Sequence, residues 1–272
     1  MKKSVLEYIK SRQPIVIAHR GASGSAPENT LAAFKMAKDA GADGIELDVH
    51  LSASGDLVVI HDYELNRTAR KTNGDPLDLI INVEDLTLGR LRQYDFGISF
   101  SKKYAGEKIP TLREAMDLIG PEILLDIEIK ANKGKPYKEL SVALARFLFD
   151  YSRKKSINNV FVSSFNPFAL NVFRKESRKL KMEISTALIY ANNSEVPAVL
   201  RFGQGRLIHD PDILKPWDRN LTNRKDLSGG GFMKRKPVLA WTVDDPNTAK
   251  DLFNRHIAGV ITNFPEKILK VR

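Results

Sequence analysis

The chain has 272 residues, of which 42% are hydrophobic and 28% are charged, and its 43 Lys and Arg residues outnumber its 33 Asp and Glu residues to give a formal net charge of +10. This apolar fraction excludes a disordered polymer, and 17 Gly with 13 Pro are too few for a collagen. Because cysteine is absent, disulfides, zinc–thiolate sites and thiol nucleophiles are excluded as well. The length allows one large α/β barrel or two domains of average size.

For the N-terminal segment we expect a short helix and no signal peptide. Its first residues resemble the start of a signal peptide, but Glu7 and Lys10 interrupt the apolar stretch that such a peptide needs. Apolar residues at helical spacing predict a short amphipathic helix over residues 4–11. No window of the sequence approaches the roughly 20 apolar residues of a membrane span. We therefore expect a cytoplasmic protein without stable membrane insertion.

Short apolar runs then alternate with longer amphipathic runs, which is the pattern of βα units in a parallel sheet. Eight strands with interleaved helices predict an α/β fold of the (β/α)8 TIM-barrel type, which typically has about 250 residues. A doubly wound sheet is the alternative, but the first strand–helix turn lacks the Gly-x-Gly-x-x-Gly pattern of nucleotide-binding folds. The expected strands are 15–19, 44–51, 122–130, 159–164, 183–189, 205–209, 237–243 and 258–262. The expected helices are 28–40, 111–119, 137–153, 166–178, 194–201, 216–227 and 246–255.

Residues 62–110 interrupt this alternation, because the segment is too long for an ordinary strand–helix loop. It contains turn signals such as Asn73-Gly74 and several aromatic residues. We interpret it as a small subdomain on the catalytic rim of the barrel, where insertions shape access for the substrate. A long ordered loop without function is the alternative. The expected organisation is a single domain over residues 1–272 with the 62–110 insertion within it.

Two expected strands carry acidic residues where apolar residues are normal. Alternation places Glu46 and Asp48 on one face of the second strand, and Asp126, Glu128 and Lys130 on one face of the third. In a barrel this inward face forms the floor of the active site, where unpaired carboxylates would repel one another. Carboxylate ligands without cysteine favour a hard cation, Mg²⁺ or Ca²⁺, over Zn²⁺. Salt bridges to nearby basic residues are the alternative interpretation.

Two histidines lie where apolar strands give way to loops. His19 ends the first expected strand, and His61 directly follows an apolar run. Because imidazole titrates near neutrality, we predict that these two side chains form an acid/base pair. We place His50 on the outward face of its strand and His256 in a helix, and interpret both as non-catalytic. His209 is left open.

These motifs resemble, in order, the signature of the glycerophosphodiester phosphodiesterase family. The resemblance extends over about residues 15–265 and implies a (β/α)8 barrel with a small insertion after the second strand. The matching segments are His19-Arg20-Gly21, Pro27-Glu28-Asn29-Thr30, Gly44-Ile45-Glu46-Leu47-Asp48-Val49, His61-Asp62, Ile109-Pro110-Thr111-Leu112, Glu128-Ile129-Lys130, Ser164-Phe165, Trp241-Thr242-Val243 and 259–265. One departure is Asn263, at a position where family members often carry Asp.

The resemblance implies a role for each matching residue. Glu46, Asp48 and Glu128 would be the ligands of one Mg²⁺ or Ca²⁺, and His19 and His61 would be the general base and the general acid. The sequence leaves open whether the two histidines exchange these roles, and whether water or a hydroxyl of the substrate is the nucleophile. The residues implied to contact the substrate or line its pocket are Arg20, Asn29, Lys130, Phe165 and Trp241.

The implied activity is metal-dependent hydrolysis of glycerophosphodiesters to sn-glycerol 3-phosphate and an alcohol. One alternative is lysophospholipase-D-like hydrolysis of lysophospholipids, and another is a basic protein that binds nucleic acid or an anionic surface. The basic clusters are scattered and match no binding motif, so solvated surface lysines explain them. We therefore expect a small anionic phosphodiester as the partner and no nucleic acid, and we make no prediction of the oligomeric state.

Overall fold

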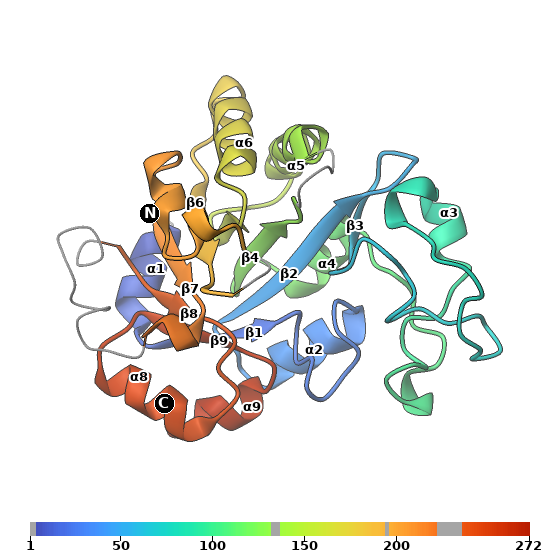
Figure 1. Ribbon diagram of the computed structural model, residues 1–272, viewed down its shortest axis with the longest axis horizontal. Coiled ribbons are helices and arrows are strands. Elements are labelled where there is room, and N and C mark those ends of the chain that lie inside the picture. Colours follow the sequence, from blue (N-terminus) through green and yellow to red (C-terminus); the bar gives the residue numbers. More distant parts are fainter. Residues whose placement is uncertain (1–3, 132–136, 194–195, 222–235) are drawn as a thin grey trace.

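The computed structural model describes residues 4–131, 137–193, 196–221 and 236–272, and eight parallel strands form a barrel in this part of the chain (Figure 1). The strands follow one another around the barrel in the order β7-β6-β5-β4-β2-β1-β9-β8. Two isolated parallel bridges, Leu214 with Val238 and Trp217 with Trp241, join β7 to β8 and close it. The strands are β1 (Ile15–His19), β2 (Gly44–Leu51), β4 (Leu124–Ile129), β5 (Val160–Ser164), β6 (Ser185–Tyr190), β7 (Ile213–Pro216), β8 (Leu239–Ala240) and β9 (Gly259–Thr262).

Helices surround the strands, and polar residues define where several of them begin. Ser4 and Thr111 each form a capping box with the glutamate three residues later, which satisfies otherwise free backbone N–H groups of the first turn. The helices are α1 (Val5–Arg12), α2 (Leu31–Asp39), α3 (Leu88–Leu91), α4 (Leu112–Ile119), α5 (Tyr137–Ser152), α6 (Pro167–Lys179), α8 (Pro246–Asn254) and α9 (Pro265–Ile268). None of these helices, the longest of which has 16 residues, has the length and apolar character needed to cross a membrane.

The barrel interior is apolar at one level and charged at the next. Ile17, Leu124 and Phe161 belong to an apolar interior cluster that also includes Val5 and Ile9 of α1. Further along the same strands, toward their C-terminal ends, the buried side chains become polar. The apolar layer supports the fold, and the charged layer above it is the candidate site. The polar members on β2, β4, β5 and β7 are Glu46, Asp48, Asp126, Glu128, Ser163 and Lys215.

The sequence-based prediction fails between β6 and β8. The expected strand 205–209 is wrong: Gln204–Leu207 form a 3₁₀ helix, and the strand is Ile213–Pro216. Leu207 is 86% exposed, whereas Ile213 and Leu214 pair with β6. The runs 205–209 and 213–216 are both short and partly apolar, and only the second pairs with the sheet. Of the expected helix 194–201, the described residues 196–201 contain only a short 3₁₀ turn, Ala198–Leu200, and residues 194–195 lie outside the described residues.

The expected helix 216–227 is also wrong where the structure describes it. Pro216 ends β7, and the four residues Asp218–Leu221 form a 3₁₀ helix. Residues 216–221 are therefore occupied by the end of a strand and a 3₁₀ turn and do not form an α-helix. Residues 222–227 of this prediction lie outside the described residues.

The long segment after β2 forms a layer beside the barrel. The chain returns along β2 as the antiparallel strand β3 (Leu57–Val59), and the segment that follows extends to one side in Figure 1. Asp95 organises this segment, since its carboxylate accepts hydrogen bonds from the backbone N–H groups of Gly97, Ile98 and Gly106. A separate apolar cluster supports it: Val58, Ile60, Leu65, Ala69, Val83, Leu91, Phe96 and Ile109. The division into one barrel domain and a 62–110 insertion stays a prediction.

Candidate active site

Three buried carboxylates meet toward the C-terminal ends of β2 and β4. These strands are parallel neighbours, and their register places Glu46 opposite Asp126 and Asp48 opposite Glu128. Carboxylate oxygens of Glu46, Asp48 and Glu128 lie within 4.8 Å of one another. Burial, assisted by the charge of Asp48, raises the pKa of Glu46 well above its ordinary value. The structure thus brings together the three residues expected as metal ligands, at a place where their charge needs compensation.

The donor set of this cluster suits a hard cation. Oδ1 of Asp48 is buried and accepts no hydrogen bond, and its ion-pair partner is the ammonium of Lys130 at 3.2 Å. All the donors are carboxylate oxygens, which are the ligands that Mg²⁺ and Ca²⁺ prefer. A divalent cation would complete the coordination of these oxygens and offset their repulsion. The residues present therefore fit the expected cation.

Two basic side chains lie against the same carboxylates. Nζ of Lys130 is 2.8 Å from Oε1 of Glu128 and 3.2 Å from Oδ1 of Asp48. Nε of Arg20 is 3.4 Å from Oδ2 of Asp48. The ion pairs expected under the alternative interpretation are therefore present as well. They place two cationic groups where a phosphate could also contact them, because Arg and Lys are the usual phosphate ligands.

The charges of this buried layer do not balance among the described residues. With all four carboxylates ionised they would face three cationic groups and the layer would be short of one positive charge, and burial together with the neighbouring carboxylates raises the pKa of Glu46 accordingly. Uncompensated buried charge is costly, and a divalent cation would reverse the sign of the imbalance. A cation together with a singly charged phosphodiester would bring the total to zero. The members are Glu46, Asp48, Asp126 and Glu128 against Arg20, Lys130 and Lys215.

The sequence did not reveal Lys215, a buried partner of the acidic strands. Its Nζ lies 2.5 Å from Oδ2 of Asp126 and donates to Oγ of Ser163 at 3.0 Å. Ser163 in turn donates to Oδ1 of Asp126 at 2.6 Å. Asp126 is therefore paired with β5 and β7 and lies outside the three-carboxylate cluster. The sequence feature that indicates Lys215 is a lysine within the apolar run 213–216. It was not assigned to the barrel interior because the strand was predicted at 205–209 instead.

Asn29 holds Asp48 through both ends of its amide. Nδ2 of Asn29 donates to Oδ2 of Asp48 at 2.8 Å, and Oδ1 accepts from the backbone N–H of Asp48 at 3.3 Å. Arg20 and Asn29 both have positive φ, 55° and 57°, and the Asn29 N–H donates to the Arg20 carbonyl. Such backbone conformations are unusual outside glycine and often occur at functional sites. The loop after β1 thus fixes one ligand of the cluster.

His19 contacts a neutral partner. Its Nδ1 lies 2.7 Å from Oδ1 of Asn263, while Nδ2 of Asn263 donates to Oδ2 of Asp244 at 2.7 Å. Because Asp244 fixes the orientation of the amide, its oxygen faces His19 and can only accept. His19 must then carry its proton on Nδ1, which leaves Nε2 as an acceptor. Burial, followed by the charge of Arg20, lowers the pKa of His19 to about 3.

His61 contacts a charged partner. Its Nδ1 lies 2.6 Å from Oδ1 of Asp62, and Oδ2 of Asp62 accepts from Nε of Arg67 at 2.5 Å. Burial opposes ionisation of Asp62, but the hydrogen bonds from His61 and Arg67 hold its pKa well below the ordinary value. A carboxylate at this position stabilises the charged imidazolium. The two histidines therefore have different electrostatic surroundings.

Two further histidines have structural contacts, and His256, which was expected in a helix, lies in the turn after α8 with a φ of 60°. His50 is not on the outward face: strand alternation places it with Glu46 and Asp48, and its Nε2 lies 3.1 Å from the carbonyl oxygen of His61. The prediction was wrong because the side chains of this strand keep alternating between the two faces through residue 50. Nε2 and Nδ1 of buried His209 contact Thr186 and Asn171, which links β6 to α6.

Aromatic side chains form another part of the rim. Phe165 and Trp241, expected to line the pocket, pack edge to face with ring centroids 5.4 Å apart. The indole N–H of Trp241 donates to the carbonyl oxygen of Lys215 at 2.9 Å, which anchors this pair to β7. Phe165 directly follows β5 and Trp241 directly follows β8, so both rings lie at the C-terminal end of the barrel.

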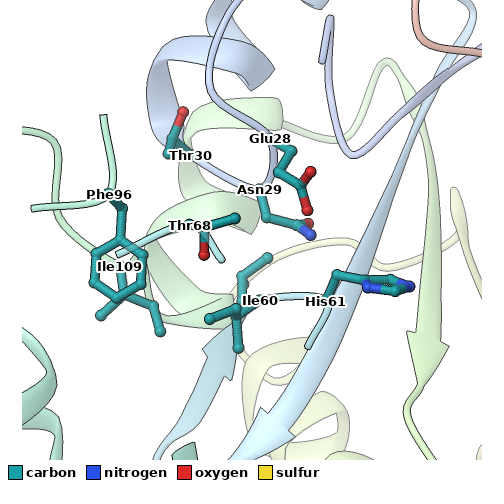
Figure 2. A pocket seen from close by; sticks show the side chains of 9 residues that line it. Glu28, Asn29, Thr30, Ile60, His61, Thr68, Phe96 and Ile109 are labelled. Atoms are coloured by element: carbon teal, nitrogen blue, oxygen red, sulfur yellow. The ribbon is translucent and has the colours of Figure 1, made fainter. Parts of the chain in front are cut away.

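A small pocket adjoins the site on the side of the 62–110 segment (Figure 2). The side chains of Thr68, Phe96 and Ile109 form one part of its lining, and the ring of His61 points away from them. The pocket thus lies between His61 and the apolar side chains of Phe96 and Ile109 in the segment. Its lining residues are Glu28, Asn29, Thr30, Val59, Ile60, His61, Thr68, Phe96 and Ile109.

Comparisons with known proteins show the family of this chain. Residues 19–267 match the model of the glycerophosphoryl diester phosphodiesterase family. The chain is 36% identical over 258 residues to a glycerophosphodiester phosphodiesterase of Caldanaerobacter subterraneus, which covers 94% of this chain and 97% of that protein. It is 34% identical over 257 residues to a putative glycerophosphodiester phosphodiesterase of Bacillus subtilis, with 94% and 96% covered.

A solved structure extends the likeness to three dimensions. It is that of an Oleispira antarctica phosphodiesterase in complex with the product sn-glycerol-3-phosphate. The two chains are 30% identical with a TM-score of 0.79, and the match covers 97% of this chain and 98% of that one. The expected family resemblance and the expected TIM-barrel fold are thus confirmed.

Proposed function

Because the chain belongs to the glycerophosphoryl diester phosphodiesterase family, it is an enzyme that acts on glycerophosphodiesters, and we propose that it hydrolyses them with a divalent cation and two histidines. The products would be sn-glycerol 3-phosphate and an alcohol. The observation that carries this proposal is the cluster of Glu46, Asp48 and Glu128, with His19 beside it on β1 and His61 beside it after β3. The comparisons do not favour lysophospholipid cleavage or nucleic-acid binding.

The cation would be held by the three carboxylates of the cluster. When bound, it supplies Lewis-acid polarisation of a phosphate oxygen. Glu46 is kept in place by the backbone N–H of Arg20, which donates to its Oε2 at 3.0 Å, and Asp48 is kept in place by Asn29. The protein thus orients its ligands before any substrate arrives, which lowers the cost of reorganisation.

Arg20 and Lys130 would bind the phosphate. The guanidinium of Arg20 offers several donors in a fixed plane, and the ammonium of Lys130 is a compact charge. Both groups already lie against Asp48, so a phosphate would share them with the carboxylates. Phe165 and Trp241 would form the apolar wall for the organic part of the substrate.

The surroundings of the two histidines support a division of labour. His19 would be the general base, because its partner Asn263 is neutral and its Nε2 is left free to accept a proton from the attacking oxygen. His61 would be the general acid, because Asp62 stabilises the protonated ring that must give its proton to the leaving alkoxide. Each transfer contributes roughly 10²–10⁴-fold in rate.

Calorimetric titration and a coupled assay test the cation site together. We expect Mg²⁺ or Ca²⁺ to bind the purified protein and EDTA to abolish turnover of glycerophosphocholine. Asp48→Asn should weaken cation binding at least tenfold, because a charged ligand is lost, whereas Glu139→Gln, at an exposed position of α5, should leave both properties unchanged. Full turnover in EDTA, or an Asp48→Asn variant that binds the cation normally, would contradict the proposed site.

A further inference from the structure

Arg67, in the segment beside the barrel, lies between two carboxylates from different loops. Its NH1 and NH2 donate to the two carboxylate oxygens of Glu28 at 2.8 and 2.7 Å. Its Nε donates to Oδ2 of Asp62 at 2.5 Å. One guanidinium therefore uses both of its edges, and neither Arg67 nor Glu28 has a role in the function proposed above.

Each of the two carboxylates also contacts a residue of the site. Oε1 of Glu28 accepts from NH1 of Arg20 at 3.0 Å, and Oδ1 of Asp62 lies 2.6 Å from Nδ1 of His61. The result is one continuous chain, Arg20–Glu28–Arg67–Asp62–His61. It runs from the group that would bind the phosphate to the group that would protonate the leaving oxygen.

This series of side-chain contacts differs from an isolated salt bridge on the surface, which contributes little to stability. The Glu28 and Asp62 side chains are only 21% and 26% exposed, and the contact between Arg67 and Glu28 is bidentate. Paired hydrogen bonds to a planar guanidinium fix geometry as well as energy. A lysine could supply the same charge but could not occupy both carboxylates in one plane.

We propose that Arg67 is a positioning residue that holds Asp62 against His61 and Glu28 against Arg20, and so fixes the proton donor relative to the bound phosphate. This inference rests on the proposed function, because it assumes that His61 protonates the leaving oxygen. Without Arg67, Oδ2 of Asp62 loses the hydrogen bond from Nε of Arg67, and the carboxylate can rotate away from Nδ1 of His61. Arg20 would also be paired with a Glu28 side chain that is no longer held in place.

Two substrates that differ only in the leaving group separate this role from a structural one. A glycerophosphodiester of choline needs a proton on its leaving alkoxide, whereas one of p-nitrophenol leaves without much help from an acid. For Arg67→Met we expect kcat/KM on the choline ester to fall about 10- to 100-fold, which is part of the roughly 10²–10⁴-fold that a general acid supplies. The nitrophenyl ester should lose much less.

Control variants make the outcome decisive. Arg90→Met removes another arginine of the same segment, whose exposed guanidinium donates to Gln93 at 3.4 Å, and should leave both substrates unaffected. Arg67→Lys should show an intermediate selective loss, and it provides the measurement if Arg67→Met does not fold. Equal losses on both substrates in the folded Arg67 variants would overturn the inference.

His61→Ala distinguishes the inference from the proposal on which it rests. If His61→Ala loses activity selectively on the choline ester and the Arg67 variants do not, the positioning role is wrong and the acid assignment stands. If His61→Ala itself shows no selectivity, the acid assignment in the proposed function is wrong.

Discussion

At the scale of single residues, the two catalytic candidates differ mainly in the charge of one neighbour. His19 faces the amide of Asn263, and His61 faces the carboxylate of Asp62. A neutral acceptor fixes the tautomer of a histidine without favouring its protonation, whereas an anionic one favours the imidazolium. The same ring can therefore be suited to accept a proton at one position and to donate one at the other.

Exchange of the two residues behind His19 tests this difference. In the double variant Asp244→Asn/Asn263→Asp the negative charge moves next to His19, which should raise the pKa of His19 from about 3. Because the base must be neutral, activity is lost as the pH falls through this pKa, so the acidic limb of kcat/KM against pH should move upward by about 1 unit or more. An unchanged acidic limb would contradict the assignment of His19 as the base.

At the scale of elements, the charged layer depends on strands that are distant in sequence. β2 and β4 supply the three carboxylates of the cluster, while β7 supplies Lys215, which pairs with Asp126 of β4. Lys215 and Asp126 are both almost completely buried. Removal of one partner from a buried ion pair leaves an uncompensated charge, which costs much more than the pair contributes.

Lys215→Met should therefore destabilise the protein by about 3–5 kcal/mol, measured as the free energy of unfolding in urea. Addition of Asp126→Asn should recover part of this loss, since it removes the unpaired charge. Lys175→Met, at an exposed position of α6, is the matched control and should change stability by less than about 0.5 kcal/mol. Equal stability of Lys215→Met and the wild type would contradict the ion pair.

At the scale of the whole molecule, the apolar residues that stabilise the barrel and the charged residues of the candidate site lie at different levels along its axis. The apolar interior cluster, which includes Val5 and Ile9 of α1, supports one level, and the charged layer occupies the C-terminal ends of the strands. The residues that follow β1, β3, β4, β5, β8 and β9 then supply further parts of the site. This arrangement is general for such barrels, because all parallel strands end on the same face.

The unbalanced charge of this layer predicts that the cation stabilises the whole fold. A ligand that binds only the folded state adds about 2.7 kcal/mol of stability at a concentration 100 times its dissociation constant. Thermal unfolding with excess Mg²⁺ or Ca²⁺ should therefore occur at a higher temperature than in EDTA, and Asp48→Asn should reduce this shift. The absence of a shift at saturating cation would argue against the site.

The sequence by itself determined most of the fold and predicted the three carboxylates that the structure brings together. Alternating apolar and amphipathic runs predicted the barrel, and carboxylates on two strands predicted which side chains would meet. These signals are local, because alternation along a strand determines which residues share a face. The predictions failed for β7, where two short apolar runs competed and only pairing with β6 selected Ile213–Pro216.

Only the tertiary structure decided how the site residues are paired. Lys215 with Asp126, Asn263 with His19 and Arg67 with Glu28 join residues 89, 244 and 39 positions apart. No periodicity connects such positions, since their contact depends on which loops the closed barrel brings to the same rim. The difference in charge between the partners of the two histidines, on which their assigned roles depend, is visible only there.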